Sequence, residues 1–305
     1  MRPGARVLAL ITLALAAAAV LPAVAQEIEL RAYANAPRGM NFVAVGYGYQ
    51  TGGVLLDPSL PVEDVEAEIH TGFVRYTRTF GMFGKAAKLK AMLPVSSGDW
   101  RGLVGGAERE REASGLGDGR VTLEVDLLGA PALSPREFAG YRQKTIVGVS
   151  LTTVVPTGAY DDTKLINLGS NRWAFRGEVG ASQALGRWVV EATAAFWYYM
   201  ENDDFFGGST LAQDPFYTLN VGGIYSLRPG FWLGVGAARG QGGSTTVNGV
   251  ESDTEQRNWR FTAVCAYPID RRQGLSVTVG SGESEGAGSD FDQYALAYQF
   301  AWGGS

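Results

Sequence analysis

Several absences narrow the class of protein. The chain of 305 residues has one cysteine, Cys265, so no disulfide can form within it, even in an oxidising compartment. Cys265 also lies far from the N-terminus, which argues against a lipid anchor on cysteine. Beyond residue 20 no apolar run approaches the 18 residues of a membrane-spanning helix, so we expect no such helix. The net charge of −5 argues against a nucleic-acid partner.

The N-terminus carries an export signal. Two arginines precede an apolar run over residues 7–20, and Ala23-Val24-Ala25 then supplies the small residues of a cleavage site. A basic start, a short apolar stretch and a small-x-small site are typical of a secretory signal peptide. The sequence therefore predicts a leader over residues 1–25 and one exported domain over residues 26–305.

The exported part alternates in polarity from one residue to the next. Between residues 187 and 200, Val190 and Phe196 share one parity, whereas Glu191 and Thr193 share the other. This period of two predicts strands with one apolar and one polar face, and many are long enough to cross a membrane at a tilt. The parity is ambiguous only in a few strands, among them 65–80. We predict about twelve strands, over residues 40–50, 65–80, 85–95, 119–128, 142–155, 172–185, 187–200, 216–227, 231–240, 257–268, 274–281 and 291–302.

Short and long connections alternate between these strands. Three to six residues join some neighbours, as at Arg228-Pro229-Gly230, while the connections between those pairs are long. Short turns at one end and long loops at the other are typical of outer-membrane barrels. The long connections are 51–64, 96–118, 156–171, 201–215, 241–256 and 282–290. Segment 129–141 breaks the rule; its Ser134-Pro135-Arg136-Glu137 reads as a capping box and predicts a short helix at the short-turn end.

The last predicted strand has the clearest pattern. Large apolar residues occupy every second position, followed by Trp302 in the same parity. The strand resembles the C-terminal strand by which bacterial outer-membrane barrels are recognised for assembly, which implies the barrel-assembly machinery as a partner. The candidate assembly signal is Tyr294, Leu296, Tyr298 and Phe300.

A soluble β-sandwich or soluble barrel shows the same alternation with its faces reversed, so alternation alone does not decide between the two. The alternating connection lengths, the long strands and the aromatic last strand favour an all-β, antiparallel, up-and-down transmembrane barrel in the outer membrane. Such a barrel would contact outer-membrane lipids and lipopolysaccharide.

Three Gly-rich segments resemble one family of outer-membrane proteins. They are Gly115-Leu-Gly-Asp118, Pro156-Thr-Gly158-Ala-Tyr160-Asp161 and Asn167-Leu-Gly-Ser-Asn-Arg-Trp173. In order and spacing they are similar to the family named for the MetA pathway of phenol degradation, over most of the exported part. The resemblance implies an outer-membrane barrel for the passage of aromatic or other hydrophobic compounds. The family offers no catalytic residues to carry over.

Signs of enzymatic chemistry are weak. Gly282-Glu-Ser284-Glu-Gly286 matches the hydrolase motif G-x-S-x-G, but that motif needs a strand-to-helix turn and a later histidine. The only histidine, His70, lies far upstream, and no serine stands out at matching depth in a neighbouring strand. We therefore expect no catalytic residues and no cofactor, and the hydrolase remains the least favoured alternative.

The acidic pairs Asp161-Asp162 and Asp203-Asp204 fall in predicted outer loops. They are more typical of solvated loop charge than of calcium ligands, because neither has the spacing of a calcium loop.

Charged residues on the polar parity are the candidates for a functional site. They either line a pore that selects solutes or pair with one another and fill the lumen, and the sequence leaves both alternatives open. The set is Lys88, Lys90, Glu124, Asp126, Arg176, Glu178, Glu191 and Arg260.

The sequence predicts a passive channel for small, hydrophobic or aromatic solutes. Passage would be passive because the chain has no phosphate-binding loop. The alternative is a structural or adhesive barrel with a closed lumen. Whether residues 26–39 enter the lumen as a plug bears directly on this choice.

Overall fold

The computed structural model describes residues 28–55, 62–286 and 288–303. The predicted leader, residues 1–25, lies outside the described residues.

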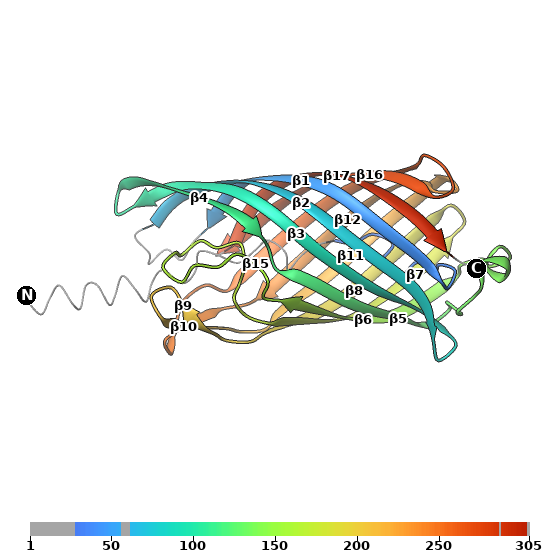
Figure 1. Ribbon diagram of the computed structural model, residues 1–305, viewed down its shortest axis with the longest axis horizontal. Coiled ribbons are helices and arrows are strands. Elements are labelled where there is room, and N and C mark those ends of the chain that lie inside the picture. Colours follow the sequence, from blue (N-terminus) through green and yellow to red (C-terminus); the bar gives the residue numbers. More distant parts are fainter. Residues whose placement is uncertain (1–27, 56–61, 287, 304–305) are drawn as a thin grey trace, which may run out of the picture.

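Thirteen strands are hydrogen-bonded in one antiparallel sheet, in the order β2-β1-β17-β16-β15-β12-β11-β8-β7-β6-β5-β3-β4. Strand β2 also pairs with β3, whereas β4 pairs only with β3, so twelve strands close a barrel and β4 extends it (Figure 1). The strands are β1 (Met40–Leu55), β2 (Val62–Met82), β3 (Lys85–Val104), β4 (Ala107–Leu116), β5 (Gly119–Leu128), β6 (Thr145–Val155), β7 (Ala174–Leu185), β8 (Trp188–Tyr199), β11 (Phe216–Arg228), β12 (Phe231–Gly242), β15 (Gln256–Pro268), β16 (Gln273–Gly286) and β17 (Gly288–Gly303).

The last strand closes the barrel onto the first. The register of β17 on β1 runs without interruption from Met40 opposite Gly303 to Leu55 opposite Gly288. All neighbouring strands are antiparallel and joined in chain order around the wall, as predicted. Closure leaves the wall without an exposed sheet edge, which a bilayer would not tolerate.

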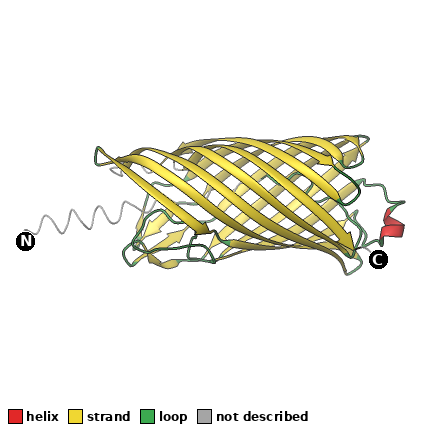
Figure 2. Ribbon diagram, turned by 45° about the horizontal axis from the view of Figure 1, so that its top comes forward, coloured by secondary structure: helices red, strands yellow, loops and turns green. Residues whose placement is uncertain are grey.

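The two ends of the barrel differ. At one end the strands are joined by short turns, and the C-terminus and the helix α2 (Pro135–Phe138) lie there (Figures 1 and 2). The other end carries the longer connections. Four short strands form a second sheet there: β9 (Asn202–Phe205), β10 (Ser209–Gln213), β13 (Thr245–Val247) and β14 (Val250–Glu251). We call these the short-turn end and the long-loop end.

Side chains alternate between the two faces of the wall, with apolar residues outside. In β8, Val190 and Phe196 are 44% and 41% exposed, whereas Ala195 and Trp197 are buried. In β2, Val74 and Tyr76 point outward, which resolves the parity that the sequence left ambiguous. The apolar face is therefore the exposed one, the reverse of a soluble barrel.

The predicted helix is present and capped as expected. The Ser134 hydroxyl accepts a hydrogen bond from the Glu137 amide, and the Glu137 carboxylate accepts one from the Ser134 amide at 2.8 Å. The Ser134 hydroxyl and the Ser134 amide both donate hydrogen bonds to the Glu137 carboxylate, and these lower the pKa of Glu137. Among the described residues no helix is long and apolar enough to cross a membrane.

The strands at the long-loop end are longer than predicted. Strands β2 and β3 have 21 and 20 residues, and much of segments 51–64, 96–118 and 282–290, predicted as loops, is strand. The reason is visible in the hairpin of β3 and β4, which projects beyond the barrel. Solvent reaches both of its faces, so Glu108-Arg-Glu-Arg-Glu112 carries no apolar parity and reads as a loop.

Candidate functional site

The lumen is occupied by the N-terminal segment, residues 28–39, which we call the plug segment. From Met40, at the short-turn end, the chain runs back into the barrel, and its side chains contact inward-facing residues of several strands. A turn closes between Arg31 and Ala34, with Arg31 at a φ of 64°. Of the segment 26–39 singled out in the sequence, residues 28–33 contact the inside of the wall, whereas Asn35 and Arg38 bond the 129–141 connection at the short-turn end.

Charged contacts hold one side of the plug segment. The Glu29 carboxylate pairs with Lys90 Nζ at 3.0 Å and with Arg75 Nη1 at 3.4 Å. Lys88 Nζ donates to the carbonyl oxygen of Ala32 at 2.7 Å, and the Arg31 amide donates to Glu191 Oε2 at 2.7 Å. These partners come from three different strands, β2, β3 and β8, so the plug segment cross-links the inside of the wall.

Glycines of the wall make room for the apolar side chains of the plug segment. A Cβ atom added at Gly222 or Gly234 would lie 2.6 Å from Leu30, and one at Gly236 would lie 2.9 Å from Ile28. These distances are too short for real Cβ contacts. Glycine on the inward parity of β11 and β12 therefore leaves a depression that Leu30 and Ile28 fill.

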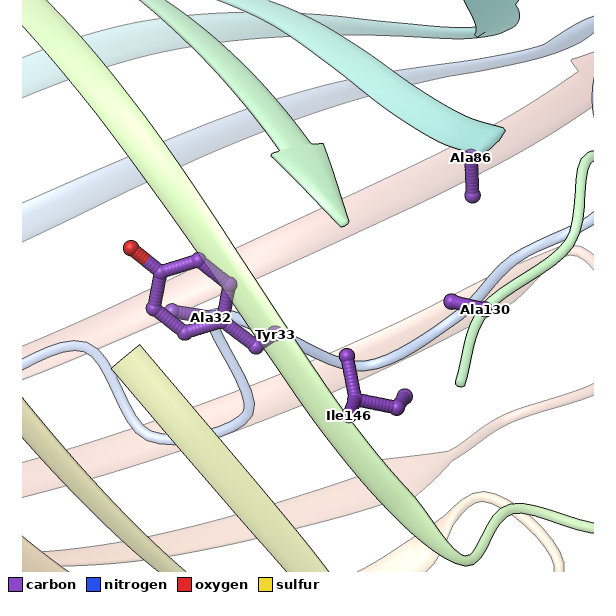
Figure 3. Close-up of a cluster of buried hydrophobic side chains, with 5 residues drawn as sticks. All are labelled: Ala32, Tyr33, Ala86, Ala130 and Ile146. Carbon is purple, nitrogen blue, oxygen red and sulfur yellow. The ribbon is translucent and has the colours of Figure 1, made fainter. Parts of the chain in front are cut away.

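Tyr33 fills a second depression, formed by Gly148 in β6 and Gly180 in β7. The two glycines lie directly opposite each other in the strand register, and a Cβ atom on either one would overlap the tyrosine ring. Tyr33 is 2% exposed and packs with Ile146, as Figure 3 shows. Its hydroxyl donates to Glu178 Oε1 at 3.0 Å.

The predicted lumen charges fall into separate groups. Lys88 and Lys90 both pair with Glu124, at 2.5 Å and 2.9 Å, and the Glu124 side chain is 2% exposed. Arg176 pairs with Glu178 on the same strand.

The remaining three predicted charges belong to neither of these groups of ion pairs. Glu191 bonds the plug segment, whereas Asp126 is buried without a hydrogen-bond partner for its carboxylate oxygens among the described residues. Arg260 lies on another part of the wall, where it donates to the carbonyl and hydroxyl oxygens of Ser289 at 2.7 Å and 2.9 Å.

These charges lie on one side of the lumen. The strands β2, β3, β5, β6, β7 and β8 form a charged arc, which carries every predicted lumen charge except Arg260, together with Arg75. The strands β11, β12, β15, β16, β17 and β1 form the opposite arc, which we call the neutral arc because it carries only Arg260 of the predicted lumen charges. In the middle of β16, β17 and β1 the inward positions are small or uncharged: Gly46, Gly48, Ser276, Thr278, Ala295 and Ala297.

The connection 156–173 folds back on itself at the long-loop end. The Asp118 carboxylate accepts hydrogen bonds from the amides of Gly158 and Ser170, at 2.9 Å and 2.8 Å. Gly158 and Gly169 pack so closely that a Cβ atom at Gly169 would lie 2.7 Å from the Gly158 backbone. The Gly-rich segments singled out in the sequence thus build this one loop together with Asp118.

The same loop crosses the mouth of the barrel. Leu165 packs against the cluster of Phe205, Leu211 and Val247, which belongs to the small sheet. Ile166 and Leu168 pack against another buried cluster, which includes Trp100 of β3 and Phe291 of β17. The loop therefore reaches across the long-loop end, and the plug segment lies in the lumen beneath it.

Aromatic side chains line the wall below this loop. Trp197 and Tyr199 of β8 are stacked, with ring centroids 6.1 Å apart, and Phe216 of β11 packs beside them. The Arg172 guanidinium lies 5.0 Å from the Tyr199 ring centroid, and burial lowers the pKa of Arg172 to about 10. This patch was not predicted from the sequence. Its signal is the alternation in β8, where Trp197 and Tyr199 share one parity and Phe196 and Tyr198 share the other.

The candidates for hydrolase chemistry are placed differently from the expectation. Ser97 of β3 lies directly opposite His70 of β2 on the outer face, so a serine does share the depth of the histidine. That pairing appears only once the register is known. The His70 Nδ1 atom is hydrogen-bonded to the Tyr47 hydroxyl at 2.6 Å rather than to serine. The Gly282–Gly286 motif lies within β16 and not in a loop or a strand-to-helix turn.

The acidic pairs lie at the long-loop end, one in a loop and the other in a short strand. Asp161 accepts two hydrogen bonds from Thr163, which lower the pKa of Asp161. Asp203 and Asp204 lie in β9. Among the described residues no three metal-ligating side chains come together.

The candidate assembly residues all lie on the outer face of β17. Tyr294 and Leu296 are 49% and 52% exposed, and the Tyr298 hydroxyl donates to Gln273 at 2.6 Å. Phe300 stacks on Trp302 with ring centroids 5.9 Å apart. They form a continuous apolar ridge that ends at the short-turn end.

Comparison with known proteins identifies the family. The model of the family described as "Putative MetA-pathway of phenol degradation" matches residues 46–300. The chain belongs to this family. No characterised protein with a curated description matches the chain. The family assignment predicted from the three Gly-rich segments is therefore confirmed.

Solved structures with a similar fold are outer-membrane barrels. An outer membrane channel from Pseudomonas putida F1 matches with a TM-score of 0.77 and 21% identity, covering 90% of this chain and all of that one. The transport unit of the autotransporter AIDA-I from Escherichia coli matches at 0.52 and 7% identity, covering 98% and 99%. The β domain of the Bordetella autotransporter BrkA matches at 0.51 and 10%, covering 87% and 100%. The chain is thus an outer-membrane β-barrel, with its short-turn end in the periplasm.

Proposed function

We propose that this protein is a passive channel for small aromatic or hydrophobic compounds, closed at rest by the plug segment. The observation that carries the proposal is the way in which the plug segment is held. The plug segment does not pair with the wall as a strand. Ion pairs of Glu29 hold it, and its apolar side chains fill depressions over glycines of the wall. Contacts of this kind can be broken without opening the barrel wall, whose strands remain hydrogen-bonded throughout.

The solute class follows from the surfaces that a solute would meet. The loop at the mouth carries Leu165, Ile166 and Leu168, and stacked Trp197 and Tyr199 lie on the wall below it. Farther in, β16, β17 and β1 present small uncharged side chains. An uncharged apolar solute loses little hydration free energy on such a path, whereas a charged solute meets no partner there.

Uptake into cells tests the proposal. Intact lipopolysaccharide slows the entry of apolar compounds, so a strain with a normal outer membrane is used. Cells that produce the protein should take up phenol faster than cells with an empty vector, and removal of residues 28–37 should raise the rate further. In cells that produce the intact protein, the uptake rate of a sugar of similar size should increase less than that of phenol. Equal phenol uptake with and without the protein would refute the proposal.

A closed structural barrel is the second candidate, and the plug segment and the loop 156–173, which both lie across the path through the barrel, favour it. It predicts that removal of the plug segment leaves permeability unchanged, because the loop 156–173 still covers the mouth. The absence of any conductance in both forms would support this second function.

Assembly through the last strand is also a proposal. The aromatic ridge at Phe300 and Trp302 supports recognition by the barrel-assembly machinery. Phe300→Ala together with Trp302→Ala should deplete the protein from the outer membrane, measured by fractionation, whereas deletion of residues 303–305 should not. Normal levels of the double variant would contradict this role. We likewise propose that the long-loop end contacts lipopolysaccharide.

A further inference from the structure

The depression that holds Tyr33 has the shape of a site for a flat ring. Its floor is backbone, because Gly148 and Gly180 are paired across β6 and β7 and neither has a positive φ. Their lack of a side chain is therefore explained by the space that the ring takes and not by backbone conformation. Any larger residue at either position would exclude an aromatic ring.

The rim of the depression matches the rest of a phenol. At one end the hydroxyl of Tyr33 donates to Glu178 Oε1 at 3.0 Å, and Ser150, opposite Glu178 in the register, also hydrogen-bonds it. Ile146 packs toward the other end of the ring, and Figure 3 shows the hydroxyl pointing away from it. Arg176 pairs with Glu178 and keeps the carboxylate in place. The depression thus offers a flat apolar floor and an anionic acceptor at one end.

The occupant of this depression is removable. Backbone atoms near Tyr33 are held by the Lys88 ammonium, at 2.7 Å from the Ala32 carbonyl oxygen, and weakly by the Ser182 hydroxyl, at 3.4 Å from the Tyr33 carbonyl oxygen. No strand pairing is involved. A free molecule with the same ring and hydroxyl can therefore take the place of the Tyr33 side chain.

We propose that the Gly148–Gly180 depression is a binding site for phenols, and that Tyr33 occupies it in place of the solute. The proposal rests on the proposed function only in requiring that solute reach the lumen. Solute and plug segment then compete for one site, so a bound phenol favours the open channel. Because Glu178 is an acceptor, the site takes a neutral phenol, binds benzene less well and rejects benzoate.

Competition gives the test. Phenol binding to the folded, full-length protein in detergent is measured by titration calorimetry for the natural chain, Tyr33→Ala and Tyr33→Phe. A competitor that occupies the site for most of the time weakens apparent affinity by the inverse of the free fraction. Tyr33→Ala should therefore bind phenol at least about tenfold more tightly than the natural chain. Tyr33→Phe keeps the ring in place and should gain much less.

Filling the floor separates this site from other apolar surfaces. Adding Gly180→Leu to Tyr33→Ala should abolish phenol binding. If that chain does not fold, as judged by heat-dependent gel mobility, Glu178→Gln in the Tyr33→Ala chain replaces it and should weaken phenol binding without affecting benzene. Equal phenol affinity of the natural chain and Tyr33→Ala, binding that survives Gly180→Leu, or an unchanged phenol affinity in Glu178→Gln would overturn the proposal.

The uptake assay keeps the two proposals apart. If phenol uptake is increased but Tyr33→Ala binds phenol no more tightly than the natural chain, the proposed binding site is refuted and the channel function stands. If the affinities are as expected but phenol uptake is not increased, the binding site stands and the proposed channel function is refuted.

Discussion

The charged arc and the neutral arc of the lumen are built from the same number of strands, yet their inward-facing side chains differ in charge and in size. The charged arc buries Lys88 and Glu124 and pairs them, and Lys90 pairs both with Glu124 and with Glu29 of the plug segment. On the neutral arc, β16, β17 and β1 carry small side chains that need no partner. The difference indicates that the charged arc holds the plug segment by ion pairs, whereas β11 and β12 of the neutral arc hold it by depressions over glycines. Under the proposed function, the small side chains of β16, β17 and β1 leave room for a solute.

The largest difference between the arcs should appear when a charge is left without its partner. Glu124→Gln leaves Lys88 and Lys90 buried with one carboxylate fewer, which should cost about 3 kcal/mol of unfolding free energy. Thr278→Ala on the neutral arc removes no charged contact and should cost about 0.5 kcal/mol or less. Urea unfolding of the protein in lipid vesicles measures both. Equal costs would show that the arcs do not differ in this way.

A second effect, of comparable size, separates the two faces of the neutral arc. Val277 is 48% exposed on the outer face, and Thr278, its neighbour, points inward. Val277→Lys should cost about 2–4 kcal/mol because the ammonium faces lipid, whereas Thr278→Lys should cost roughly 0–1 kcal/mol if the neutral arc is wet. Folding yield and urea unfolding measure both variants. A Thr278→Lys cost as large as that of Val277→Lys would mean that this side of the lumen is packed as well.

The smallest effect concerns the ion pairs between the charged arc and the plug segment. Glu29 is 44% exposed, so its pairs with Lys90 and Arg75 should contribute only about 0.5 kcal/mol. Glu29→Gln should therefore raise the fraction of time that the channel is open by roughly twofold, measured from single-channel records. Gln273→Glu, at the periplasmic turn, is the matched control and should change nothing. An unchanged open fraction in Glu29→Gln would place the anchoring contacts elsewhere.

The wall could be predicted from the sequence because its physics is local. A residue on the lipid face must be apolar and its neighbour need not be, so Val190 against Glu191 already fixes the parity. The capping box at Ser134 fixes the helix in the same way. The strand extensions near Glu108-Arg-Glu-Arg-Glu112 were not predicted, because a hairpin in water has no apolar face to mark it.

The sequence raised the possibility that residues 26–39 enter the lumen, but it could not decide it. Glu29, Leu30 and Tyr33 meet residues that are distant in sequence, and no periodicity marks such contacts. One signal was present: Gly148, Gly180, Gly222 and Gly236 share the inward parity of their strands, where barrels otherwise place side chains. The paired charges fit the alternative of a filled lumen, but the plug segment, and not the charges alone, does much of the filling.

The conductance of the protein without its plug segment tests the central claim most directly. Single-channel currents are recorded in planar bilayers for the natural chain, for a chain that lacks residues 28–37, and for one in which a Gly-Ser stretch of equal length replaces them. Folding of each is verified by heat-dependent gel mobility. The account predicts low conductance for the natural chain and a several-fold rise for the deletion, with the Gly-Ser chain between them. The same conductance in all three folded chains would contradict it.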